Sequence, residues 1–357
     1  MSNAPILYSN SDADAPTFPS PHYTNTDTGY LRYFNFYHIL KTCLVDGYAG
    51  KPGAGWSIGF DHVVTYDLSN RFAYSLINAD NSGTMVIMMH PGSANMIKVI
   101  LCEAAPDFNT IINGWSGQNS WESGGEKTYN SHFLGLPNLG HDNSTHNWKL
   151  VANKNAAVLM VELTASGWPA GDLQTSSQAY SHSLYFGAHQ GMPALGGIQA
   201  PEQGNFVVLG GYSGSEGSNS ATAYLNFLHA TSSTITYLAD ESGAPYSYQT
   251  HATGHIYPPY TTTMRDTVGV SILIPIQLTK PSANLQYGES TFLIPVFANL
   301  NAGINVAAIR KLRENGENPT DCTLGGVLNH GGKPYLVMAQ NTSATLPWIS
   351  LSLEDWY

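Results

Sequence analysis

Short apolar runs alternate with segments rich in Gly, Asn, Ser and Thr along most of this chain. Runs of this kind, bounded by turn-forming residues, predict β-strands. The segments that we expect to form strands are 70–76, 84–89, 96–101, 148–152, 156–163, 183–187, 205–209, 234–238, 268–278, 292–297, 304–309, 333–339 and 348–351. Residues 103–146, in which Gly, Asn and Ser recur, and residues 241–262 are expected to be loops.

One helix is predicted near the N-terminus, over residues 31–46. Apolar residues between Leu31 and Leu44 partly follow the helical period, and Gly47 comes directly afterwards, where a helix stop is expected. A tight glycine-rich loop then leads to Trp56. The pattern therefore predicts one short helix that ends in a turn before the first strands.

The fold class that follows is mainly β, with two β-sandwich or barrel-like domains and one short N-terminal helix. We expect an extended arm over residues 1–30, a helix and β domain over 31–146, and a C-terminal β domain or domains over 147–357. The arm is polar and rich in Pro, so a packing surface has to order it. The chain's own body and a neighbouring subunit are both candidates, and we favour the neighbouring subunit.

Composition narrows the range of functions. Charged residues make up 11% of the 357 residues, less than half of the roughly 25% that is usual. The net charge is -11, and the 14 Lys and Arg residues form no run, which argues against direct nucleic-acid binding. A weakly charged surface loses little solvation energy when a neighbouring subunit covers it, so the composition favours a homo-oligomer.

The compartment is inferred from what the sequence lacks. The N-terminus shows no signal-peptide pattern, and no apolar stretch approaches the roughly 20 residues that span a bilayer. We therefore expect production in a reducing cytoplasm and no membrane insertion. The odd number and wide spacing of Cys43, Cys102 and Cys322 argue against a disulfide framework or a zinc site, so buried free thiols are expected.

Two histidine segments are candidates for metal sites. His251 and His255 have the i, i+4 spacing that places two ligands on one face of a helix, but Gly254 and the following prolines make a helix improbable. The stretch from His141 to His146 contains imidazole and carboxylate ligands that could clip a loop onto a divalent ion. A polar, solvated linker is the simpler interpretation of that stretch.

Catalytic patterns also fail on their spacing. In Gly211-Tyr212-Ser213-Gly214 the second glycine comes one place too early for a nucleophile elbow. The glycine-rich loop 50–55 lacks phosphate-loop spacing, and Pro52 removes an amide donor, so turns that allow close backbone approach explain it better. The loop carboxylates that could form a glycosidase pair are Asp172, Glu202, Glu216, Asp240 and Glu241. We expect no catalytic residue, no cofactor and no metal site.

Three tryptophans remain as binding candidates. Trp115, Trp121 and Trp168 lie in polar, glycine-rich surroundings. A tryptophan in such a place can stack on a sugar or anchor an interface, or it can cap the core of its own domain. These alternatives stay open at this point.

One block of the sequence resembles a protein family. The segment Ile39–Trp56, ILKTCLVDGYAGKPGAGW, followed by residues 70–74, is similar to a recurring block in virion structural proteins of tailed bacteriophages. Weaker similarity continues at 147–152, 185–187, 256–258 and 332–337, with Trp356 near the end; the long loops at 103–146 and 210–222 depart from the pattern.

The resemblance implies a location in the virion. We expect a non-enzymatic structural component, in the tail, the baseplate or at a fibre attachment, that contacts itself and other virion proteins. A receptor- or glycan-binding module that recognises a host-surface glycan, and a capsid-surface decoration protein, are the alternatives. A polysaccharide-degrading enzyme would need a close carboxylate pair.

Overall fold

The structure of the chain is a computed structural model. The described residues are 4–18, 20–21, 31–63, 72–89, 96–107, 110–112, 120–123, 127–130, 132–135, 148–162, 181–188, 190–191, 206–209, 234–239, 245–247, 249–252, 273–279, 291–299, 327–330, 332–338, 349–354 and 356. All statements about the structure below concern these residues.

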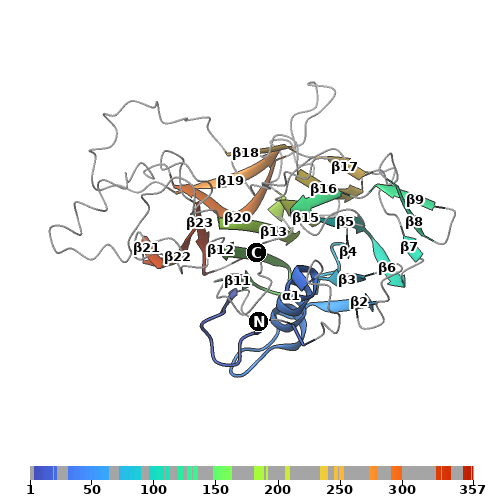
Figure 1. Ribbon diagram of the computed structural model, residues 1–357. Helices are drawn as coiled ribbons and strands as arrows, with labels where there is room; N and C mark the ends of the chain where they lie inside the picture. Colours follow the sequence, from blue (N-terminus) through green and yellow to red (C-terminus); the bar gives the residue numbers. More distant parts are fainter. Residues whose placement is uncertain are drawn as a thin grey trace, which may run out of the picture.

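Strands dominate the described residues, and the pairings within the three larger sheets are antiparallel (Figure 1). The first sheet has the spatial order β1 (Ile6–Ser9), β11 (Trp148–Ala152), β12 (Ala156–Glu162), β13 (Ser181–Ala188), β15 (Phe206–Leu209), β16 (Thr234–Ala239) and β17 (Pro245–Ser247). The second has the order β10 (His132–Gly135), β5 (Met96–Cys102), β4 (Thr84–Met89), β3 (Ala73–Ile77) and β2 (Ser57–Asp61).

The C-terminal part of the chain supplies the third sheet. Its order is β18 (Gln249–Ala252), β19 (Leu273–Thr279), β20 (Thr291–Asn299), β23 (Ile349–Ser352), β22 (Lys333–Met338) and β21 (Val327–His330), and β14 (Gln190–Gly191) also pairs with β20. Two hairpins form separate two-stranded sheets: β6 (Ala104–Asp107) with β7 (Thr110–Ile112), and β8 (Ser120–Ser123) with β9 (Lys127–Asn130). Within the described residues, the expected mainly β fold with one short helix is confirmed.

The predicted helix over 31–46 is also confirmed, but it changes type along its length. Residues Leu31–Leu40 form α1, and Lys41–Asp46 continue it as the π-helix η2. Eight of the ten residues of α1 are buried. A helix that is buried nearly all round lies inside a core rather than on a surface. No helix in the described part of the chain is long and apolar enough to cross a membrane.

One hydrophobic cluster joins the helix to the first two sheets. It includes Tyr37 from α1, Tyr74 and Ile87 from the second sheet, and Trp148 and Leu159 from the first. These residues come from both sides of position 146, so α1 and the described parts of the two sheets share a core. The division of the whole chain near residue 146 stays a prediction.

The N-terminal arm corrects one expectation. Residues Ile6–Ser9 form β1, which pairs antiparallel with β11 of the same chain, and Tyr8 is completely buried. The backbone N–H of Ser20 donates a hydrogen bond to Oδ1 of the buried Asn35 in α1, at 2.8 Å. The described part of the arm is thus ordered by the chain's own body, where we favoured a neighbouring subunit.

Two segments expected to be loops contain strands. Five short strands, β6 to β10, lie within residues 103–146, and β17 and β18 lie within 241–262. Hairpin strands of three or four residues bury few side chains, so no apolar run marks them in the sequence. The expected strand at 70–76 begins at Ala73, and the expected strand at 304–309 lies outside the described residues.

Candidate functional site

The glycine-rich loop after η2 folds back onto the end of the helix. Gly47 has a φ of 78° and donates its N–H to the carbonyl of Thr42 at 2.7 Å. Farther along the loop, the N–H of Ala54 reaches the carbonyl of Cys43 at 3.0 Å. The N–H groups of Gly55 and Trp56 both reach the carbonyl of Leu44, at 3.1 and 3.0 Å. The loop therefore supplies hydrogen-bond donors to carbonyls that a helix end leaves without partners.

This closure depends on a glycine at position 53. A Cβ atom added to Gly53 would lie 2.2 Å from the carbonyl oxygen of Val45 and 2.6 Å from its carbonyl carbon. Both are backbone atoms of η2, so no side-chain movement can relieve the contact. The loop shows the close backbone approach that its glycines predicted. The amides of Gly47 and of residues 54–56 are bonded to helix carbonyls, so these four amides are occupied rather than presented to a phosphate group.

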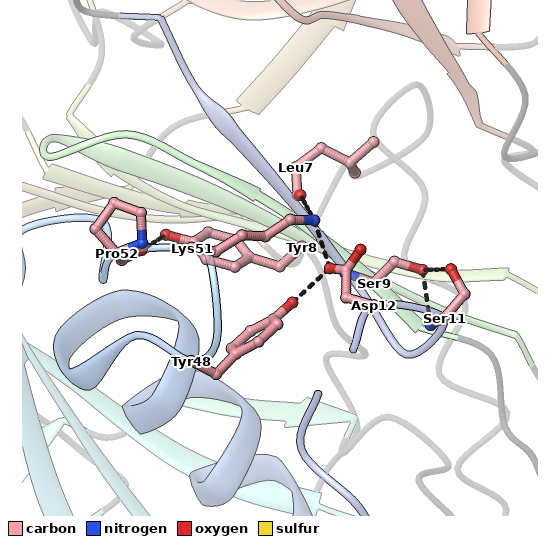
Figure 2. A network of polar contacts seen from close by, with 8 residues as sticks. All are labelled: Leu7, Tyr8, Ser9, Ser11, Asp12, Tyr48, Lys51 and Pro52. Carbon is pink, nitrogen blue, oxygen red and sulfur yellow. Dashed lines mark hydrogen bonds and ion pairs between the residues drawn. The ribbon is translucent and has the colours of Figure 1, made fainter. Parts of the chain in front are cut away.

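Lys51 of the same loop fastens the N-terminal arm (Figure 2). Its Nζ donates to Oδ2 of Asp12 at 2.5 Å and to the backbone carbonyl of Leu7 at 2.7 Å. Oδ2 of Asp12 also accepts the Tyr48 hydroxyl at 2.6 Å and the N–H of Ser9 at 2.8 Å. We call these three side chains, Asp12, Tyr48 and Lys51, the arm cluster. It holds β1 and the turn after it against the loop.

Tyr8 adds a second point of attachment beside the arm cluster. Its hydroxyl donates to the carbonyl of Pro52 at 2.6 Å, and its ring packs against Tyr48 with centroids 5.8 Å apart. Pro52 has no backbone N–H to donate, but its carbonyl accepts this hydrogen bond. Burial raises the pKa of Tyr8, so its hydroxyl stays protonated and remains a donor.

The electrostatics of this region suit attachment rather than catalysis. Burial alone would raise the pKa of the Asp12 carboxyl, but the hydrogen bonds from Lys51, Tyr48 and Ser9 and the charge of Lys51 lower it overall. Burial raises the pKa of the Cys43 thiol well above its usual value. A cysteine nucleophile acts as the thiolate, so Cys43 is poorly suited to covalent chemistry. Asp12 is an ionised carboxylate already bonded to three donors.

A second polar group lies at the aromatic part of the core. The Tyr37 hydroxyl of α1 donates to Oδ2 of Asp61 at the end of β2. Tyr74 of β3 packs edge-on against Tyr37 with ring centroids 4.9 Å apart, and Phe72 contacts both rings. The Tyr74 hydroxyl is buried, and it has no hydrogen-bond partner among the residues that the structure describes. A buried hydroxyl without a partner costs about 1–3 kcal/mol, so the effect of removing it can be measured.

A third polar junction connects two hairpin turns. Asn78, at the end of β3, donates from Nδ2 to the carbonyl of Asn155 at 2.9 Å, in the turn between β11 and β12. Trp56 donates from Nε1 to the carbonyl of Asn153 in the same turn, also at 2.9 Å. The Trp56 ring packs edge-on against Phe186 at 5.5 Å. Trp56 therefore ties the end of the glycine loop to the first sheet.

The described residues contain few of the predicted site candidates. His251 lies in strand β18, opposite Gln277, so it does not take part in a helical i, i+4 pair. Among the described residues, no three His, Cys, Asp or Glu side chains lie close enough to hold a metal ion. Cys43 and Cys102 are buried free thiols, as expected. The candidates outside the described residues are Trp115, His141–His146, Trp168, Asp172, Glu202, Gly211–Gly214, Glu216, Asp240, Glu241, His255 and Cys322.

Sequence reasoning missed the arm cluster. In the sequence, Lys51 stands out only as a candidate phosphate ligand, and no pattern marks Asp12 or Tyr48. Thirty-nine positions separate Asp12 from Lys51 in the chain. The only signal available was a lone lysine in a glycine loop within a chain poor in cations.

No protein-family model matches the sequence, and no curated protein matches it either.

Proposed function

We propose that the chain is a non-enzymatic structural component of a bacteriophage virion, in the tail, the baseplate or at a fibre attachment. In this proposal it consists of two β-sandwich or barrel-like domains that meet near residue 146. It assembles in the host cytoplasm through contacts with further copies of itself and with other virion proteins. The weakly charged composition supports assembly, because few charges have to lose water when faces are buried.

The proposal rests on how the block from Ile39 to Trp56 is hydrogen-bonded to the rest of the fold. This block holds the resemblance to tailed-phage virion proteins, and its polar groups bond to other parts of the same fold. Lys51 and Tyr48 hold the arm, the loop amides bond to the end of η2, and Trp56 reaches the first sheet. Because these polar groups are bonded within the fold, they stabilise the contacts between its segments. This supports a mechanical role.

The proposal is tested on the particle and on the purified chain. Mass spectrometry of particles from the phage whose genome encodes this chain should detect it at a fixed ratio to the known structural proteins. Light scattering of the purified chain should show a mass that is a multiple of 38.5 kDa. A chain that is absent from particles and strictly monomeric at all concentrations tested would contradict the proposal.

The position within the particle follows from symmetry. Electron microscopy of particles labelled on this chain should show it at the tail, the baseplate or a fibre junction. Icosahedrally distributed label would instead support the alternative of a capsid-surface decoration protein. Closed assemblies of different symmetry bury similar surfaces, so the label and not the purified chain decides between these positions.

A further inference from the structure

The outer edge of β1 is the side of this strand that faces away from β11. β1 stands at the end of its sheet, so among the described strands only β11 pairs with it. Asn10, directly after β1, donates its N–H to the carbonyl of Trp148. Successive residues of an antiparallel strand direct their backbone polar groups alternately to one side and the other. The backbone groups of Leu7 and Ser9 therefore lie on the outer edge.

Most of these outward groups are already hydrogen-bonded to the arm cluster. The Leu7 carbonyl accepts a hydrogen bond from Nζ of Lys51 at 2.7 Å, and the Ser9 N–H donates to Oδ2 of Asp12 at 2.8 Å (Figure 2). The Ser9 carbonyl accepts the N–H of Asp12 at 3.0 Å. The cluster thus occupies both outward groups of Ser9 and the carbonyl of Leu7. Its polar atoms lie where those of a further strand would have to be.

The strand itself carries little protection against pairing. A row of unpaired backbone groups at a sheet edge is a template for another chain, and proteins commonly block it with charges, prolines or bulges on the edge strand. Residues 6–9, Ile-Leu-Tyr-Ser, contain no charge and no proline, and the register of β1 against β11 is regular. The blocking groups come instead from the turn after β1 and from the glycine-rich loop.

The outer edge also fits a second copy of itself. When two β1 strands are placed antiparallel about a twofold axis at Tyr8, Leu7 of each copy lies opposite Ser9 of the other. Both residues direct their N–H and carbonyl groups outward, so each such pair can exchange both of its N–H···O bonds. The two strands are uncharged, so no like charges oppose each other across the pair. A twofold contact of this kind uses the same surface on both copies.

We propose that the arm cluster blocks edge-to-edge pairing of β1 with β1 of a second copy of this chain. Lys51 and Asp12 bond to each other at 2.5 Å as well as to the strand, so their ion pair bridges the outward groups of Leu7 and Ser9. The cluster holds the arm on its own sheet and also closes the edge that the arm creates. The wild type prevents this contact, so the inference is separate from the contacts between copies in the proposed function.

The test is light scattering of the full chain with and without the ion pair. Asp12→Ala/Lys51→Met keeps the net charge and frees the Ser9 N–H and the Leu7 carbonyl. With rising concentration its mass should reach at least about twice that of the wild type under the same conditions, because edge pairing joins two copies. Asp46→Ala/Lys41→Met is the matched control. It removes the 2.6 Å ion pair of η2, which does not contact β1, and should leave the mass unchanged.

Adding Leu7→Pro to Asp12→Ala/Lys51→Met separates edge pairing from other association. Proline removes the outward N–H of residue 7, which the pairing needs, and removes no N–H directed at β11. The triple variant should therefore return to the wild-type mass. Hydrogen exchange read by mass spectrometry should show the Tyr8 amide, which faces β11, still protected in every variant.

Four results would each overturn the proposal. They are an unchanged mass in Asp12→Ala/Lys51→Met, equal association of the matched control, association that persists with Leu7→Pro, and loss of protection at Tyr8 in the associating variant. The last result would show that a detached arm, and not an open edge, causes the association. The mass of the wild type reports on the proposed function, whereas the difference between the variants and the wild type reports on the edge.

Discussion

Replacement of Gly53 by alanine tests the account of the glycine loop most directly. The added Cβ would lie 2.2 Å from the carbonyl oxygen of Val45, which is far inside van der Waals contact. The obstacle is helix backbone, so the loop has to move away from η2. That movement strains or breaks the three hydrogen bonds that the N–H groups of residues 54–56 donate to the carbonyls of Cys43 and Leu44.

The expected cost follows from those three bonds. A typical hydrogen bond contributes about 1 kcal/mol net, and a carbonyl left buried without a partner costs about 1–3 kcal/mol. Cys43 and Leu44 are fully buried, so water cannot easily replace the lost donors. We therefore expect Gly53→Ala to lower the free energy of unfolding by about 3–4 kcal/mol.

Gly50→Ala provides the matched control in the same loop. Gly50 has a φ of 78°, and a Cβ added there would meet nothing within 4 Å. It isolates the backbone cost of a left-handed conformation, which is about 1–2 kcal/mol for an L-residue. Gly53→Ala should therefore lower the free energy of unfolding more than Gly50→Ala does, although of these two glycines it is Gly50 that has the positive φ.

Two measurements check this prediction. Urea unfolding followed by tryptophan fluorescence gives the free energies of the two variants. Hydrogen exchange read by mass spectrometry should show lost protection at residues 54–56 in Gly53→Ala and retained protection in Gly50→Ala. If Gly53→Ala unfolds at the same urea concentration as Gly50→Ala or a higher one, the close approach to Val45 does not matter and the reasoning is wrong.

Three further predictions concern groups whose environments the structure defines. The pKa of Asp12 is lowered from 3.8, so the stability that its carboxylate contributes is present above that value and is lost as pH falls through the lower folded-state pKa. Asp12→Asn should lower the free energy of unfolding by about 1–2 kcal/mol at neutral pH. In a plot of that free energy against pH, the variant should show a weaker decrease on the acid side than the wild type. Tyr74→Phe should be neutral or stabilising by about 1 kcal/mol in urea unfolding, because it removes an unpaired hydroxyl, whereas Tyr37→Phe should be destabilising; a clear loss of stability in Tyr74→Phe would show that its hydroxyl has a partner. Burial raises the pKa of Cys43 well above its usual value and that of Cys102 to about 12, so peptide mapping after treatment with a thiol reagent at pH 8 should find neither labelled until urea unfolds the chain.

Much of the secondary structure could be predicted where an element buries a continuous apolar run. The strand at 84–89 is observed with the predicted bounds, and the helix beginning at residue 31 ends before Gly47 as its sequence indicates. The short strands between 104 and 135 could not be predicted in this way. They are only three or four residues long, so none contains an apolar run of the length that marks a strand in the sequence.

The candidate site was likewise predictable only in part from the sequence. The glycines of the loop 47–55 indicated a close backbone approach, because glycine is the residue that permits one. The atom that is approached, the carbonyl oxygen of Val45, became apparent only when η2 and the loop were placed together. The pairing of Asp12 with Lys51 likewise depends on β1 lying beside β11, which brings together residues about 140 positions apart.

The sequence by itself determined the mainly β character, the short helix near the N-terminus and the scarcity of charge. These are local or additive properties, since a strand or helix period and a count of charges need no knowledge of partners. Only the tertiary structure decided that the arm joins the first sheet of its own chain, that Lys51 bonds to Asp12, and that Trp56 bonds to the carbonyl of Asn153. The physical reason is that pairing depends on which surfaces meet, and many partners are compatible with the same local pattern of apolar and polar residues.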